Sequence, residues 1–260
     1  MIKKVLAASL NFLGAAITAS PTHALNITAP SAYTGTAGNG ITVALFNNSN
    51  RTYQQQIAGS QLSGIAIGDS ITGVTYRIGS DIARPNSLAA TFANWDLTLA
   101  QAANSIGSMS TTYASNMTNP ILVRSGALSL AANDFIGGAT SPSVNPFGVK
   151  ISFTTPYIYQ GGDLVFLVSH TAGSSPVGSF DALLVSTSGY GTDFRAMFDT
   201  LYNGTTAEVS NTNFAITQFT TIASVPVPFE FSPTLGIGIL GGAWLVRRKL
   251  RKKSAITSKK

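Results

Sequence analysis

The sequence predicts an all-β chain, with a single β-sandwich or jelly-roll-like domain between an N-terminal signal peptide and a C-terminal transmembrane helix. Short runs of alternating apolar and polar residues recur through the middle of the chain, separated by loops rich in Gly, Ser, Asn and Pro. Each end instead carries an apolar segment beside Lys and Arg residues. These observations divide the chain into residues 1–24, 25–225 and 226–260.

The N-terminal segment has the order of a secretory signal peptide. Lys3 and Lys4 precede a mostly apolar run over residues 5–19. As a helix this run would span about 22 Å, too short for a comfortable membrane anchor. Small residues flank His23 just before Leu25, so we predict cleavage between Ala24 and Leu25.

Three strands of the middle segment are predicted from alternation with a period of two. The residues expected on their buried faces are Val74, Tyr76, Ile78, Trp95, Leu97, Leu99, Val149, Ile151 and Phe153. The residues expected on their exposed faces are Thr75, Arg77, Asp96, Thr98, Lys150, Ser152 and Thr154. These strands would each bury one side in the core.

Further strands follow from short apolar runs between turn-forming residues. Residues 164–168 are continuously apolar and predict a central strand, buried on both faces. Additional strands are expected within residues 41–46, 121–130, 180–185 and 214–222. A helical period is suggested only over residues 87–93.

Charge and cysteine content exclude several classes of function. The formal net charge is +6, from 16 Lys and Arg against 10 Asp and Glu. Most of the positive charge lies at the two ends, and residues 25–225 have a net charge of −3. This distribution argues against nucleic acid as a partner. The chain has no cysteine, which excludes disulfides and thiolate metal sites.

The C-terminal segment combines a Pro-rich stretch, an apolar run and a basic cluster. Residues 234–246 are apolar and would span about 20 Å as a helix, whereas counting from Pro228 gives a longer segment able to cross a thinned bilayer. Basic residues that would remain in the cytoplasm follow directly, namely Arg247, Arg248, Lys249, Arg251, Lys252 and Lys253. An ordinary single-pass anchor has the same physical signature.

The order of Pro228-Phe229-Glu230, a Gly-rich apolar helix and the basic cluster resembles the PEP-CTERM sorting signal, in the Pro-Phe-Glu variant of cyanobacterial members. The tail over residues 254–260 departs from members that stop after the basic cluster. This resemblance implies an exosortase-like processing enzyme and the inner membrane as partners, in bacteria that make exopolysaccharide. Residues 71–172 also resemble a β domain of exported PEP-CTERM proteins, which implies no catalytic residues.

Gly68-Asp69-Ser70-Ile71 is close to the Gly-Asp-Ser-Leu start of a serine esterase family. Such a serine requires a histidine base oriented by a carboxylate. His170 is the only histidine of residues 25–225, and Leu167 stands where the esterase pattern has aspartate. We therefore interpret the motif as a turn before a strand, and His170 as a residue that closes a strand or lies in solvent.

Four aspartates have neighbours suited to calcium binding: Asp163, Asp181, Asp193 and Asp199. Because no EF-hand or repeat spacing accompanies them, we interpret them as turn-forming residues. Any two of the nine acidic residues of the body could in principle form a glycosidase pair, but none has a favourable sequence context. We predict no catalytic residue, metal ligand or cofactor.

Aromatic residues offer an alternative site. Trp95, Tyr157, Tyr159 and Tyr190 could form a platform on which sugars stack, although aromatics in strands more often pack in the core or across strands. The polar loop over residues 47–51 is either a binding edge or a solvated turn.

These features predict an exported, non-enzymatic protein of the cell envelope, cell surface or extracellular matrix, sorted by its C-terminal segment. The apolar helix could retain it there. The alternative is a carbohydrate-binding module acting at the surface or in exopolysaccharide, and a secreted hydrolase ranks last. The predicted functional residues are Pro228, Phe229 and Glu230 of the sorting motif, the six basic residues after the helix, and the cleavage pair Ala24 and Leu25.

Overall fold

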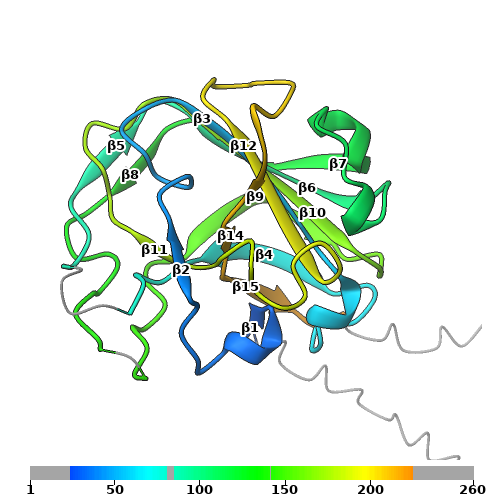
Figure 1. Cartoon of the computed structure of the whole chain (residues 1–260), viewed down its shortest axis with the longest axis horizontal. Coiled ribbons are helices and arrows are strands. Elements are labelled where there is room, and N and C mark those ends of the chain that lie inside the picture. The colour runs from blue at the N-terminus through cyan, green and yellow to red at the C-terminus, as the bar shows by residue number, and fades with distance from the viewer. Residues whose placement is uncertain (1–23, 81–84, 141, 225–260) are drawn as a thin grey trace, which may run out of the picture. The chain divides into compact units, whose positions relative to one another are not determined.

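The computed structural model describes residues 24–80, 85–140 and 142–224, and this part of the chain is all-β (Figure 1). It contains fifteen strands and four short 3-10 helices. Among these residues, no helix has the length and apolar character needed to cross a membrane. The predicted signal peptide up to His23 and the entire predicted sorting tail lie outside the described residues.

Two larger antiparallel sheets form the framework of the body. The four-stranded sheet has the order β1 (Ala24–Ala29), β15 (Thr217–Ile222), β4 (Ser70–Thr75) and β9 (Ile151–Ile158). The six-stranded sheet has the order β13 (Val209–Thr212), β12 (Phe194–Asp199), β3 (Arg51–Ile57), β10 (Leu164–His170), β6 (Trp95–Ala102) and β7 (Met117–Arg124).

Smaller elements complete the fold. A three-stranded sheet joins β14 (Phe214–Ala215), β11 (Phe180–Leu183) and β2 (Gly40–Thr42), and a pair joins β5 (Ala90–Phe92) and β8 (Leu128–Leu130). The 3-10 helices are η1 (Ser31–Tyr33), η2 (Gly59–Gln61), η3 (Ile106–Ser108) and η4 (Tyr113–Asn116).

Aromatic side chains dominate the core. Phe166 of β10 packs edge-to-face on Phe219 of β15, with ring centroids 6.3 Å apart, and so joins the two larger sheets. Phe46 centres a second cluster, where it stacks on Trp95 at 5.6 Å and contacts Phe180 at 5.0 Å. Such pairs add about 0.5–1.5 kcal/mol each beyond the area that they bury.

Several predicted strands are confirmed. The central strand is β10, which lies between β3 and β6. On β6, Trp95, Leu97 and Leu99 are fully buried, whereas Asp96 and Thr98 are partly exposed. Alternation therefore identifies the inward face of this strand correctly.

Other expectations are corrected. Thr75 and Arg77 are buried rather than exposed, and Val149 is exposed and precedes β9. The run predicted over residues 121–130 is two strands, because Gly126 adopts a φ of 89° and turns the chain between them. The suggested helical stretch over residues 87–93 contains strand β5 instead.

Strand β3 was not predicted, although it lies inside the six-stranded sheet. Gln54, Gln55 and Gln56 are all fully buried there. The Gln54 Nε2 group donates to the Tyr113 carbonyl at 3.0 Å, and its Oε1 accepts from Asn116 Nδ2 at 2.7 Å. These hydrogen bonds offset the cost of burying the Gln54 amide, and they fix helix η4 against the sheet.

Candidate binding groove between strands β7 and β9

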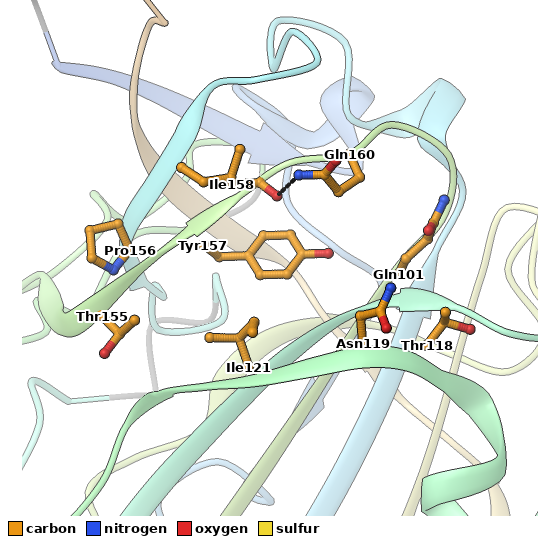
Figure 2. A pocket seen from close by; sticks show the side chains of 9 residues that line it. All are labelled: Gln101, Thr118, Asn119, Ile121, Thr155, Pro156, Tyr157, Ile158 and Gln160. Carbon is orange, nitrogen blue, oxygen red and sulfur yellow. Dashed lines mark hydrogen bonds between the residues drawn. The ribbon is translucent and has the colours of Figure 1, made fainter.

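A groove lies between the outer strands of the two larger sheets, with a volume of about 570 Å³ (Figure 2). Strand β7 forms the end of the six-stranded sheet, and β9 forms the end of the four-stranded sheet. The two strands are linked by the Thr154 hydroxyl, which donates to the Val123 carbonyl at 3.1 Å. The groove is lined by Gln101, Thr118, Asn119, Ile121, Thr155, Pro156, Tyr157, Ile158 and Gln160.

Both strands are irregular where they border the groove. On β7, Asn119 has a φ of 49°, in the left-handed region that non-glycine residues seldom adopt. On β9, residues 153–156 lie opposite Thr72 alone, because Tyr157 pairs with Ile71 and Ser152 with Gly73. Bulges of this kind redirect side chains and are frequent beside binding sites.

Tyr157 lies at the centre of the groove. Figure 2 shows its ring extending away from β9, with Ile121 opposite and the hydroxyl on the side of Gln101 and Asn119. Burial, followed by the neighbouring Tyr159, raises the pKa of the Tyr157 hydroxyl. The hydroxyl therefore keeps its proton at neutral pH and can donate as well as accept a hydrogen bond.

The polar side chains of the groove are amides and hydroxyls. Of the described residues that line it, none is charged. Gln160 Nε2 donates to the Ile158 carbonyl at 3.1 Å, and this is the one hydrogen bond drawn among the lining residues in Figure 2. Amides both donate and accept, so this set can bind a neutral, polar ligand.

The Gly-Asp-Ser motif forms a turn, as interpreted from the sequence. The Asp69 carboxylate accepts hydrogen bonds from the backbone amides of Ala66 at 2.9 Å and Ser224 at 2.8 Å. Ser70 begins β4, where it pairs with Ile158 and Ile222. Within the described residues, no hydrogen bond connects Ser70 to His170, which belongs to the other large sheet.

His170 is fully buried and is the last residue of β10. This position agrees with the interpretation that His170 closes a strand, and not with the alternative that it lies in solvent. Its Nδ1 lies 2.8 Å from the Thr171 carbonyl oxygen, and its Nε2 lies 3.1 Å from that of Ala44. Burial lowers the pKa of His170, and Arg51 acts in the same direction, whereas the two carbonyl groups oppose the change. Each ring nitrogen thus faces a backbone carbonyl, and the neutral ring donates a hydrogen bond to one of the two.

Three of the four aspartates considered for calcium, all except Asp193, have local roles. Asp163 accepts from the Gly59 amide at 3.1 Å, and Asp199 accepts from the Leu201 amide. Asp181 is paired with Arg77. In the part of the chain that the structure describes, no three histidine or acidic side chains are grouped so as to hold a metal ion.

Of the two interpretations of the four aromatic residues, the structure favours packing over a platform, because these residues are not gathered on one surface. Trp95 is fully buried, and its Nε1 donates to the Leu45 carbonyl at 2.9 Å. The Tyr159 hydroxyl donates to the Gly162 carbonyl at 2.6 Å, and that of Tyr190 donates to the Thr212 carbonyl at 2.9 Å. Of the four, only Tyr157 lines the groove.

The polar loop over residues 47–51 makes internal contacts. The Asn47 side chain accepts from the Ser49 amide at 3.1 Å, and that of Asn50 accepts from the Ala172 amide at 2.8 Å. Arg51 begins β3, with its guanidinium 4.6 Å from the centre of the Phe198 ring. These contacts favour the interpretation as a turn.

The remaining groove residues were not identified from the sequence. Gln101, Asn119 and Gln160 stand far apart in the chain, and no motif joins them. The one local signal is Asn119 before Pro120, a pair typical of a turn within an otherwise strand-like run. No protein-family model, curated protein or solved structure significantly matches the chain. The predicted sorting residues Pro228, Phe229 and Glu230 and the basic cluster lie outside the described residues.

Proposed function

We propose that the chain is an exported, non-enzymatic protein of the cell envelope, cell surface or extracellular matrix, sorted through its PEP-CTERM-like C-terminal segment. In this proposal residues 25–225 are a single β-sandwich of jelly-roll type. The exosortase-like enzyme and the inner membrane are its processing partners, and exopolysaccharide is the material in which the released body would reside.

The observation that carries this proposal is the position of the two ends of the body. Strands β1 and β15 are antiparallel neighbours, with Ala24 opposite Ile222. The cleavage bond after Ala24 and the exit toward the sorting segment after Ser224 therefore belong to the same end of one strand pair. Cleavage after Ala24 would remove only the first pair of these strands, Ala24 with Ile222, and leave the pairs from Leu25 to Ala29 in place, as a protein delivered by two processing events requires.

The contacts made by the titratable side chains also support a non-enzymatic role. Asp69, His170 and Asp181 are engaged by backbone groups or by Arg77 rather than directed together at a pocket. Catalysis of hydrolysis generally needs an acid, base or nucleophile within reach of a bound substrate. The groove between β7 and β9 offers amides and hydroxyls instead.

The proposal is tested by following the full-length protein in its native host. We expect the mature chain to begin at Leu25, as N-terminal sequencing would show. Substituting Pro228, Phe229 and Glu230 together with alanine should leave membrane insertion intact and accumulate a precursor of higher mass. The matched control replaces the next three residues, Phe231, Ser232 and Pro233, with alanine.

The control is expected to be processed like the wild type. Processing and localisation of the Pro228, Phe229 and Glu230 variant at the wild-type level would show that the motif is not a recognition element. The C-terminal segment would then be a plain anchor. Recovery of a chain that still begins at Met1 from outside the cell would contradict export through the predicted signal peptide.

A further inference from the structure

We propose that the groove between β7 and β9 binds an uncharged, hydroxyl-rich oligosaccharide. The inference goes beyond export and sorting, and it rests on the folded body alone. It assigns ligand binding to this groove rather than to the aromatic platform considered from the sequence. Most residues of the groove lie on β7 and β9, the edge strands of the two larger sheets. Three properties of the groove lead to this ligand class.

The first property is the chemistry of the polar groups. Gln101, Asn119 and Gln160 each present an amide, and Thr118, Thr155 and Tyr157 each present a hydroxyl. A sugar hydroxyl is both a donor and an acceptor, so it pairs well with side chains of the same dual character. An anionic ligand would instead require Arg or Lys, and none of the described lining residues is charged.

The second property is the apolar surface beside these groups. Ile121 and Ile158 are 40% and 45% exposed, and both line the groove with Pro156. The Tyr157 ring lies between the two strands (Figure 2). Sugar rings have apolar C–H faces as well as hydroxyl edges, so a mixture of apolar and amide surfaces matches both.

The third property is the interruption of both strand edges. Pro120 and Pro156 cannot donate a backbone hydrogen bond, and Asn119 leaves the extended conformation. An added peptide strand needs a regular row of free backbone donors and acceptors. Prolines and bulges are known devices that prevent such pairing at edges. The groove is therefore poorly suited to an added peptide strand, and its side chains remain available to a ligand.

The test uses the full-length protein in affinity gel electrophoresis and isothermal titration calorimetry. The neutral probes are dextran, laminarin and galactomannan, and the anionic probe is alginate. We expect retardation by at least one neutral polysaccharide and, at high salt, none by alginate, because salt screens the basic residues at the two ends of the chain. Binding to none of the neutral probes, or stronger binding to alginate, would overturn the inference. Faulty export or sorting would leave this result unchanged, so the two proposals fail independently.

Groove variants locate the binding surface. The double variant Gln101→Ala with Gln160→Ala should raise the Kd about tenfold, because it removes two amides. The matched control, Gln61→Ala with Gln218→Ala, removes two amides outside the groove and should bind like the wild type. Equal binding by the groove variant and its control would place the ligand elsewhere and refute the assignment.

If the double variant fails to fold, two milder substitutions test whether the groove is the binding surface. Tyr157→Phe removes a single hydroxyl and preserves the packing of the ring. Asn119→Gly removes the amide and tolerates the left-handed backbone, and Asn133→Gly is its control at another residue of positive φ, 68°. Each groove substitution should weaken binding severalfold. If neither does so relative to Asn133→Gly, the proposal is wrong.

Discussion

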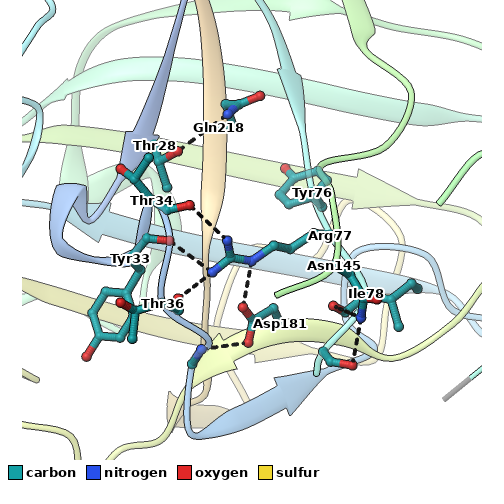
Figure 3. A network of polar contacts seen from close by, with 12 residues as sticks. Thr28, Tyr33, Thr34, Thr36, Tyr76, Arg77, Ile78, Asn145, Asp181 and Gln218 are labelled. Atoms are coloured by element: carbon teal, nitrogen blue, oxygen red, sulfur yellow. Dashed lines mark hydrogen bonds and ion pairs between the residues drawn. The ribbon is translucent and has the colours of Figure 1, made fainter. Parts of the chain in front are cut away.

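Arg77 and Asp181 form an ion pair in the interior of the body, with Nε and Oδ2 2.8 Å apart and both side chains 1% exposed. The remaining guanidinium donors reach the backbone, since Nη2 donates to the carbonyls of Tyr33 at 2.9 Å and Thr36 at 2.6 Å (Figure 3). The Gly38 amide donates to the other oxygen of Asp181 at 2.9 Å. One ion pair thus holds the segment after β1 against the rest of the fold.

Removal of one partner should be far more harmful than removal of both. We expect Asp181→Ala to lower the free energy of unfolding by about 3–5 kcal/mol, because it leaves a buried guanidinium uncompensated. The double variant Arg77→Met with Asp181→Leu should recover part of this loss. Urea denaturation followed by circular dichroism measures both. A loss below about 1 kcal/mol for Asp181→Ala would contradict a buried, coupled pair.

Stability should depend on pH through His170. Burial holds its pKa below the ordinary 6.5, so the folded protein takes up the proton less readily than the unfolded chain. The contribution of neutral His170 to the free energy of unfolding is therefore complete above pH 6.5. It declines as the pH falls from 6.5 toward the lowered pKa of the folded state.

Thermal unfolding at pH 7.5 and pH 5.5 measures this decline. Between pH 7.5 and pH 5.5 we expect the free energy of unfolding of the wild type to fall by an amount on the order of 1 kcal/mol. The fall should be smaller in His170→Gln, which lacks the titrating ring. Identical pH profiles for the two proteins would show that His170 is not the responsible group.

Gln54 should be essential for fixing the segment that contains η4. Gln54→Leu leaves the Tyr113 carbonyl without its side-chain partner, at a cost of about 1–3 kcal/mol. It also removes one of the two acceptors of Asn116 Nδ2, which keeps its hydrogen bond to the Ser110 carbonyl at 2.7 Å. We expect faster proteolysis between Asn104 and Asn116. The control is Gln218→Leu, on a partly exposed side chain, and should change neither stability nor digestion by much. Equal digestion patterns would contradict the role of Gln54.

The Gly-Asp-Ser turn should respond to loss of its aspartate and not of its serine. Asp69→Ala removes the acceptor for the Ala66 and Ser224 amides, and we expect a loss of about 1–3 kcal/mol. Ser70→Ala should stay within about 0.5 kcal/mol of the wild type, because the hydroxyl has no assigned role. Hydrolysis of an ester substrate that disappears in Ser70→Ala would instead revive the esterase interpretation.

The sequence allowed strands β6 and β10 to be predicted because burial there follows apolar character. Trp95, Leu97 and Leu99 alternate with polar residues, and Leu164 to Val168 form an uninterrupted apolar run. Strand β3 could not be found in this way. Its three glutamines give no apolar periodicity, and their burial depends on partners such as Tyr113 and Ala215 that are distant in the chain.

The groove escaped prediction for a related reason. Its walls come from residues 117–124 and 151–158, and only the tertiary packing of two sheet ends brings them together. Tyr157 was recognised as a candidate because aromatics are conspicuous in a sequence. Gln101, Asn119 and Gln160 were not, since a single amide in a polar chain carries no signal about its neighbours.

The pairing of β1 with β15 also determines how the body would respond to mechanical load. Ala24 lies opposite Ile222, so a force applied between the two ends of the body would act at one end of the strand pair. The hydrogen bonds of this pair would then be loaded one after another, as in a zipper, rather than sheared together. A body pulled by its two ends would therefore yield first by peeling at β1 and β15, before Phe166 and the central strands around it are loaded.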